Sequence, residues 1–173
     1  MELKETIRRR RSIRQYTGEP ISEEALNQIM QAALLAPTSM NRKPCRFYVV
    51  KDKDVLKKLA DAKKAGGKML ADCEAAIVTV GDSDKADTWI EDCSIAMSFM
   101  MLAAVDQGIG SCWVQIYLRK QEDGSDAEDA VREILSLKET DRIAGILALG
   151  IPAKEAEPHT EADADMGKVI RIG

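Results

Sequence analysis

The sequence predicts a domain in which helices cover both faces of a β-sheet, and three observations lead to this prediction. The chain has 173 residues, of which 45% are hydrophobic and 31% charged, which suits one globular domain and excludes a disordered chain. Segments with helical periodicity alternate with short segments rich in β-branched residues. Residues 75–80 form a largely apolar run, which is typical of a strand buried on both faces.

The first half of the chain is expected to contain three helices and one strand. Leu3 and Ile7 predict a short amphipathic helix that runs into four consecutive arginines. Ser22 is the expected N-cap of the second helix, which Pro37 ends. The apolar face of that helix contains Leu26, Ile29, Met30, Ala33 and Leu34. A strand is predicted over 47–50, and Asp52 then caps a helix that carries Val55, Leu56 and Leu59.

Helices and strands are also expected to alternate in the second half of the chain. After the strand at 75–80, a helix is expected between about residues 88 and 107, with Gly108 as its C-terminal cap. A strand at 111–116, a helix at 127–135 and a strand at 143–149 follow. The predicted order is therefore α, α, β, α, β, α, β, α, β.

The helix at 88–107 is unusual because its second half is apolar on every side. Residues 95–105 contain only one polar side chain, Ser98. A helix of this kind has no face suited to water, so we expect it to be covered all round. It is either the central core helix of the domain or also the seam of an oligomer, and the pattern leaves both open.

Net charge and cysteine spacing exclude several classes of protein. A formal net charge of -4 gives the whole chain no general attraction for nucleic acid or anionic lipid. The four cysteines lie far apart, so no metal site or dithiol motif is predicted, and each is interpreted as a packing residue. The chain start lacks the apolar core of a secretory signal, and the apolar run at 95–105 is too short to span a bilayer. We therefore expect a cytoplasmic protein with no membrane segment.

The acid–base residues give no catalytic candidate. The single histidine, His159, lies in a polar tail and is interpreted as exposed. The acidic pairs at 91–92 and 128–129 are expected on solvent faces or at helix starts. Residues 108–110 read Gly-Ile-Gly without the third glycine of a dinucleotide fingerprint, and no phosphate loop is present.

An arginine cluster near the start is the clearest candidate site. Residues 8–14 contain five arginines, with Ser12 among them. Guanidinium groups bind phosphate through two parallel hydrogen bonds, so the cluster predicts a site for an anionic ligand. A solvated basic helix end is an equally ordinary interpretation, and nucleic-acid contact is a weaker one because the rest of the chain is acidic.

A polar loop is the second candidate. Residues 37–44 read Pro-Thr-Ser-Met-Asn-Arg-Lys-Pro and offer both hydrogen-bond donors and acceptors. Such a loop can hold a polar planar ring. Taken alone, it is better explained as a connection that stops a helix.

Four segments follow one another in a specific order along the chain. They are Arg10-Arg11-Ser12-Ile13-Arg14-Gln15-Tyr16, Ala36-Pro37-Thr38-Ser39-Met40-Asn41-Arg42-Lys43-Pro44, Gly108-Ile109-Gly110-Ser111-Cys112-Trp113 and Leu149-Gly150-Ile151-Pro152. In this order and spacing they resemble the short form of the FMN-dependent nitroreductase family. The first two segments together are the most specific part of the resemblance, which covers nearly the whole chain.

The resemblance implies an α+β fold and a homodimer. Residues 1–173 would form a single FMN-binding domain, built as a three-layer sandwich with a mixed central sheet flanked by helices. Two long helices would form the seam of an intertwined dimer, with one FMN in each of two pockets between the subunits. The apolar helix at 88–107 would then be covered by a second copy.

The resemblance also assigns residues to the cofactor. The FMN phosphate, ribityl chain and pyrimidine edge would be held by Arg10, Arg11, Ser12 and Arg14. The other subunit would bring the loop residues Pro37, Thr38, Ser39 and Asn41 onto the ring system. Trp113 and Val114 would border the flavin near its reactive edge. Lys168 is the candidate for a basic phosphate ligand near the C-terminus, ahead of Arg171.

The implied activity is transfer of hydride from NAD(P)H through flavin N5 to an electron-poor acceptor, such as a nitroaromatic or a quinone. The cofactor does the redox chemistry, so no catalytic protein residue is assigned. Dehalogenase or ene-reductase activity, or a non-catalytic role in flavin binding or storage, are the alternatives. Lys43-Pro44-Cys45 stands where many relatives have Gln-Pro-Trp, which leaves substrate preference open. Cys45 is interpreted as a packing residue and not as a nucleophile.

Overall fold

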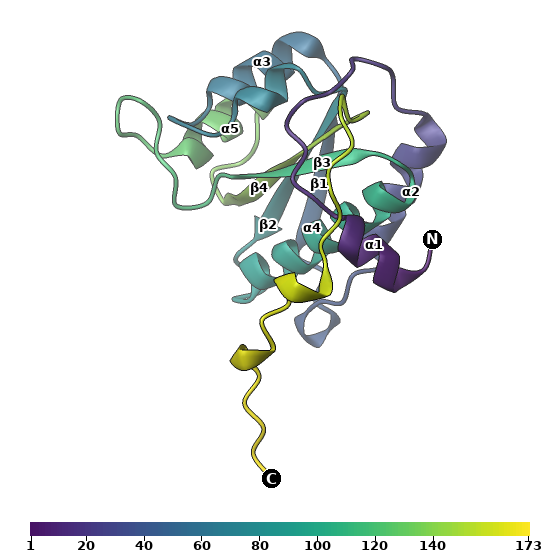
Figure 1. Cartoon of the computed structure of the whole chain (residues 1–173). Helices are drawn as coiled ribbons and strands as arrows, with labels where there is room; N and C mark the ends of the chain where they lie inside the picture. The colour runs from purple at the N-terminus through teal and green to yellow at the C-terminus, as the bar shows by residue number, and fades with distance from the viewer.

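A four-stranded antiparallel sheet forms the middle layer of the protein (Figure 1). The computed structural model describes all 173 residues. The strands are β1 (Cys45–Val50), β2 (Ala75–Asp82), β3 (Gly110–Gln115) and β4 (Asp141–Gly150). They lie in the order β1-β2-β4-β3, so β2 and β4 are central. The side chains of β2 are buried on both faces, as the apolar run predicted.

Helices cover both faces of the sheet. They are α1 (Leu3–Arg9), α2 (Glu23–Leu34), α3 (Lys53–Asp61), α4 (Trp89–Asp106) and α5 (Ala127–Leu135). One hydrophobic cluster joins the sheet to α3 and α5, and a second joins its other face to α2 and α4. The predicted element order and the three-layer α+β architecture are therefore confirmed.

The sheet is antiparallel, whereas a mixed sheet was expected. All three strand pairings, β1 with β2, β2 with β4 and β4 with β3, are antiparallel. The parallel pairing is an isolated bridge between Ser12 and Ser111. This bridge places the segment that follows α1 beside the edge strand β3.

Local capping explains where two of the helices begin. The Ser22 hydroxyl accepts a hydrogen bond from the Ala25 amide at 3.1 Å, and the Asp52 carboxylate accepts from the Asp54 and Val55 amides. The end of α2 differs from the prediction. It ends at Leu34, and this side chain is exposed and not on the buried face.

The apolar helix α4 is covered on only one side within the chain. Ala96, Met97 and Met100 are buried against the sheet and α2. On its other side Ile95 and Phe99 are 38% and 40% exposed. The core-helix interpretation thus accounts for one face of α4 and leaves an apolar face open. None of the five α-helices combines the length and hydropathy needed to cross a bilayer.

A partly buried ion pair joins the start of α5 to β4. Glu128 was expected at a helix start or on a solvent face, and it does lie in the first turn of α5, but it is only 7% exposed. Its carboxylate accepts hydrogen bonds from Arg142 Nε at 3.0 Å and Nη2 at 3.2 Å, and from the Ile143 amide at 3.0 Å. The Arg142 guanidinium also lies over the rings of Trp89 and Tyr117. The hydrogen bond to Glu128 raises the pKa of Arg142.

We predict that Glu128→Ala lowers the free energy of unfolding by about 2–3 kcal/mol, because it leaves Arg142 and the Ile143 amide without their acceptor. Urea unfolding followed by circular dichroism measures this change. Asp129→Ala is the matched control, since the neighbouring carboxylate is exposed and its loss should cost less than about 1 kcal/mol. Equal effects of the two substitutions would show that the Glu128 ion pair does not stabilise the fold.

Candidate functional site

Residues 8–17, called the arginine segment below, are held beside residues 151–159, called the C-terminal segment, by main-chain hydrogen bonds. The Thr17 amide donates to the Ile151 carbonyl at 2.9 Å, and the Ala153 amide donates to the Gln15 carbonyl at 3.0 Å. Further along, the His159 amide donates to the Arg8 carbonyl at 2.8 Å. The residues after β4 therefore run back along the arginines, before the last part of the chain extends away from the sheet (Figure 1).

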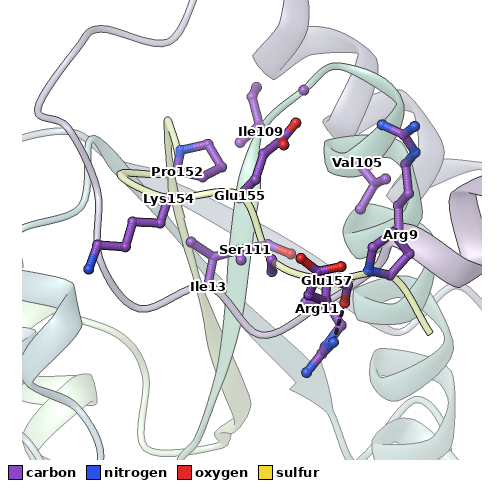
Figure 2. A pocket seen from close by; sticks show the side chains of 14 residues that line it. Arg9, Arg11, Ile13, Val105, Ile109, Ser111, Pro152, Lys154, Glu155 and Glu157 are labelled. Atoms are coloured by element: carbon purple, nitrogen blue, oxygen red, sulfur yellow. Dashed lines mark hydrogen bonds between the residues drawn. The ribbon is translucent and has the colours of Figure 1, made fainter. Parts of the chain in front are cut away.

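A cavity of about 380 Å³ lies where these segments meet the end of α4 and the start of β3 (Figure 2). Three parts of the chain contribute its lining. They are the arginine segment with Arg9, Arg11 and Ile13, the connection from α4 to β3 with Val105, Gly108, Ile109, Gly110 and Ser111, and the C-terminal segment with Pro152, Lys154, Glu155, Ala156, Glu157 and Pro158.

The cavity has the donors that an anionic ligand needs. Arg11 lines it and donates to the Glu157 carbonyl. Ser111 is 3% exposed, and its hydroxyl has no hydrogen-bond partner in the protein. A buried hydroxyl without a partner costs free energy, so a ligand that bonds to it would be stabilised there. Arg9 is partly neutralised, because its Nε donates to Glu5 at 2.6 Å and lowers the pKa of that carboxyl.

Gly110 brings the arginine segment close to β3. A Cβ at this position would lie 2.8 Å from Ile13 Cγ2, so any larger residue would push the two segments apart. Gly108 has a φ of +71°, the left-handed conformation that ends α4 and turns the chain into β3. The Gly-Ile-Gly sequence is thus explained by close packing and a helix end.

His159 occupies a different environment from the exposed one expected. It is half-buried against the arginine segment, with its carbonyl accepting from Arg8 Nε at 3.0 Å. Its ring Nε2 lies 3.4 Å from Arg10 Nη2. Arg10 itself is half-buried and lines neither cavity of the segment.

A second cavity, of about 330 Å³, opens further along the same segment. Ser12 and Arg14 line it together with Lys154 and Glu155. Both Ser12 and Arg14 are exposed, and Arg14 Nη1 lies 3.4 Å from the Ser12 carbonyl. The two cavities share Lys154 and Glu155, so Arg11, Ser12 and Arg14 border one continuous region of the surface.

The polar loop at 37–44 is fixed to the start of α4 and lines neither cavity. The Ser39 amide donates to Asp92 Oδ1 at 2.9 Å, and Thr38 Oγ1 accepts from the Lys43 amide at 3.1 Å. Asp92 lies at the start of α4, one of the two places expected for its acidic pair, and it is a buried acceptor that holds this loop. Asn41, with a φ of 55°, and Pro37 are exposed, so the loop presents them outward.

The remaining predicted site residues lie apart from the cavities. Trp113 is half-buried on the α4 side of the sheet, with its Nε1 donating to Gln115 Oε1 at 2.9 Å. The Val114 side chain is buried among the residues of the other face, which leaves only its main chain available to a ligand. Lys168 is exposed in the tail, 3.9 Å from Asp165.

Several cavity residues were not singled out from the sequence. Arg9 belongs to the arginine cluster, and Ser111 directly follows the Gly-Ile-Gly motif, so both had a nearby signal. Lys154, Glu155 and Glu157 had none, because a polar segment without periodicity gives no indication of where it lies.

Comparisons with known proteins agree with this architecture. The model of the nitroreductase family matches residues 7–71 and 61–151. A protein of Archaeoglobus fulgidus that bears the name NADH dehydrogenase/NAD(P)H nitroreductase is 39% identical over 158 residues, which cover 89% of this chain and 87% of the relative. An FMN-dependent nitroreductase from Clostridium difficile R20291 has a similar structure, with a TM-score of 0.95, 36% identity and 98% of each chain covered.

A solved structure from Parabacteroides distasonis, which also bears the name NADH dehydrogenase/NAD(P)H nitroreductase, has a TM-score of 0.89 at 28% identity. The matched region covers 99% of this chain and 98% of the Parabacteroides distasonis chain. The family match extends over most of the chain and includes the arginine segment, the polar loop and β3. The chain therefore belongs to the nitroreductase family of oxidoreductases.

Proposed function

We propose that this protein is an FMN-dependent enzyme that takes hydride from NAD(P)H and passes it to an electron-poor small molecule, such as a nitroaromatic or a quinone. The cavity beside the arginine segment is the observation that carries this proposal, because it combines Arg11 with a buried hydroxyl that has no partner. The names of the similar proteins from Clostridium difficile and Archaeoglobus fulgidus support it. In this proposal residues 1–173 form one FMN-binding domain.

The residues around the cavities suit the phosphate end of FMN. Arg11 and Arg14 supply planar donor groups that match a phosphate, the Ser111 hydroxyl borders the first cavity, and Ser12 lines the second. Arg10 adds positive charge beside His159. Lys168 lies in the tail beyond both cavities, so its proposed contact with the phosphate would require another position of the tail or a second copy.

The bound flavin would supply the redox chemistry, by accepting hydride and donating it to a second substrate. The residues of the chain would bind and orient the cofactor. Trp113, and Val114 through its main chain, would border the ring system from β3. Pro37, Thr38, Ser39 and Asn41 would approach it from a second copy, since their loop is fixed to α4 and away from the cavities of its own chain.

We also propose that two chains form a homodimer through α4. Ile95 and Phe99 lie four residues apart and expose apolar surface on the side of α4 that the chain does not cover. The tail adds further exposed apolar side chains, among them Ile170 and Ile172. A second copy would bury these groups and bring its polar loop toward the cofactor. The four free cysteines favour a reducing cytoplasm as the compartment.

We predict that Phe99→Glu converts the protein to a monomer, because a carboxylate in a dimer seam would lose its hydration without gaining a partner. Size-exclusion chromatography with light scattering should give about 38 kDa for the wild type, twice the chain mass of 19.0 kDa. Leu118→Glu is the matched control, since Leu118 is an exposed apolar residue outside α4. A wild-type mass of one chain would contradict the dimer.

We predict that Arg11→Ala raises the dissociation constant for FMN by about 10–100-fold, the loss expected for charge-assisted hydrogen bonds to a phosphate. Quenching of flavin fluorescence during titration of the apoprotein measures it. Arg119→Ala is the control, because Arg119 is exposed and lines neither cavity. Equal affinity of the two variants would place the phosphate elsewhere.

Anaerobic addition of NADH or NADPH tests the proposed activity. The purified protein is expected to be yellow and to lose its absorbance near 450 nm within the time of one turnover, on the order of 0.1–1 s for typical enzymes. The colour should return when a quinone is added. A yellow protein that neither nucleotide bleaches would instead be a flavin-binding or storage protein, and a colourless protein that does not bind FMN would overturn the proposal.

A further inference from the structure

Two cysteines that are distant in sequence lie in contact where the start of β1 meets α4. Cys45, the first residue of β1, and Cys93, in the second turn of α4, have their sulfur atoms 3.3 Å apart. Both are free thiols. Cys93 is fully buried, whereas Cys45 is half-buried and reaches the surface.

The other two cysteines have no such arrangement. Cys73 is buried and donates to the Leu70 carbonyl, and Cys112 is buried with its sulfur 3.8 Å from the Trp113 carbonyl. Neither has a second sulfur as a hydrogen-bond partner. The pair at the start of β1 is therefore a specific feature of the fold and is not a general property of the cysteines.

We propose that Cys45 and Cys93 are a reversible redox modification site, which hydrogen peroxide or another hydroperoxide converts to an intramolecular disulfide. This inference goes beyond the flavin chemistry proposed above and does not depend on it. It adds a redox role to Cys45, which also packs against the cluster of Trp89, Cys93 and Ala144, as expected of a packing residue.

The environment assigns different roles to the two sulfurs. A hydrogen bond from the Cys93 thiol lowers the pKa of Cys45 and, together with burial, raises the pKa of Cys93. The nearby carboxylate of Asp92 opposes ionisation of both. Because the thiolate is the nucleophile and Cys45 is the sulfur that solvent reaches, Cys45 is the residue that meets the peroxide, and Cys93 is the one that resolves the product.

The reaction balances with the peroxide as the only oxidant. The Cys45 thiol first releases its proton; the thiolate then attacks one oxygen of hydrogen peroxide, an S–O bond forms as the O–O bond breaks, and the departing hydroxide takes up the released proton to become water. The Cys93 sulfur then attacks the sulfur of the Cys45 sulfenic acid. The S–S bond forms as the S–O bond breaks, and the second hydroxide leaves as water with the Cys93 proton. Two thiols and one peroxide thus give one disulfide and two waters.

The bond requires only a short approach of the two sulfur atoms. The sulfur atoms must approach by about 1.3 Å to reach the disulfide length of about 2.05 Å. Gly81 is the residue paired with Cys45 across β1 and β2. A Cβ at Gly81 would lie 3.2 Å from Cys93 Sγ and 2.4 Å from Trp89 Cε3, so its absence is what allows Cys93 and Trp89 to pack here.

Oxidation would connect the polar loop to α4. Cys45 directly follows the loop at 37–44, and Asp92, next to Cys93, already accepts a hydrogen bond from the Ser39 amide. A disulfide would add a covalent link beside this hydrogen bond. We therefore expect slower opening of the loop in the oxidised protein, which is measurable as slower exchange of the Ser39 amide hydrogen.

The test exposes the reduced full-length protein to a slight excess of hydrogen peroxide. We expect the intact mass to fall by the mass of two hydrogens, a digest to contain the Cys45 and Cys93 peptides joined, and dithiothreitol to reverse both changes. The melting temperature of the oxidised form should rise by about 5–10 °C, because the disulfide closes a long loop.

Cysteine variants separate the two roles. Cys93→Ser should leave Cys45 as a sulfenic acid that dimedone traps, and Cys45→Ser should leave Cys93 as a thiol under the same exposure. Cys73→Ala is the matched control and should still lose two hydrogens, because it removes a buried thiol outside the pair.

Two outcomes would overturn the proposal. The first is a wild-type protein in which Cys45 and Cys93 both remain alkylatable after an exposure to peroxide that oxidises free glutathione. The second is oxidation of Cys45 to sulfinic acid without any Cys45–Cys93 peptide, which would show that Cys93 does not resolve the sulfenic acid.

Discussion

The candidate site depends on main-chain hydrogen bonds that hold the C-terminal segment against the arginine segment. The amides of Thr17, Ala153 and His159 make these bonds, and the bridge between Ser12 and Ser111 holds the same segment to β3 on its other side. The arginine segment is thus fixed between the edge strand β3 on one side and the C-terminal segment on the other. Without this arrangement its guanidinium groups would extend from a free connection, and there would be no wall opposite β3 to form a cavity.

The need to cover apolar side chains is the second constraint on the structure. Each face of the sheet is covered by a pair of helices, and the two clusters between these layers supply the core. Helix α4 contributes to one cluster and still exposes Ile95 and Phe99. In the proposed dimer, the sheet of its own chain would cover one side of α4 and a second copy would cover the other. The polar loop, fixed to α4 through Asp92, would be carried into the same contact.

Local sequence rules predicted the elements well because the signals that define them are local. The bounds of α5 match the prediction, and the caps at Ser22 and Asp52 begin their helices as expected. β1 begins two residues earlier than predicted, because Cys45 and Arg46 pair with Gly81 and Val80, a contact between distant residues. Glu128 and Asp92 lie at helix starts as expected, but their burial and the exposure of His159 were not predictable, because their partners lie far away in sequence. The arginine cluster was evident, but the segment opposite it was not, since main-chain hydrogen bonds can be formed by almost any sequence.

Comparison of FMN with riboflavin tests most directly whether the arginine segment recognises a phosphate. The two ligands share the ring system and the ribityl chain and differ in the phosphate alone. Isothermal titration of the apoprotein should give a dissociation constant for FMN that is at least about 100-fold lower than that for riboflavin, as two charge-assisted hydrogen bonds would provide. This difference should shrink as the salt concentration rises. Equal affinities for FMN and riboflavin would contradict the account, because the arginines would then have no part in holding the cofactor.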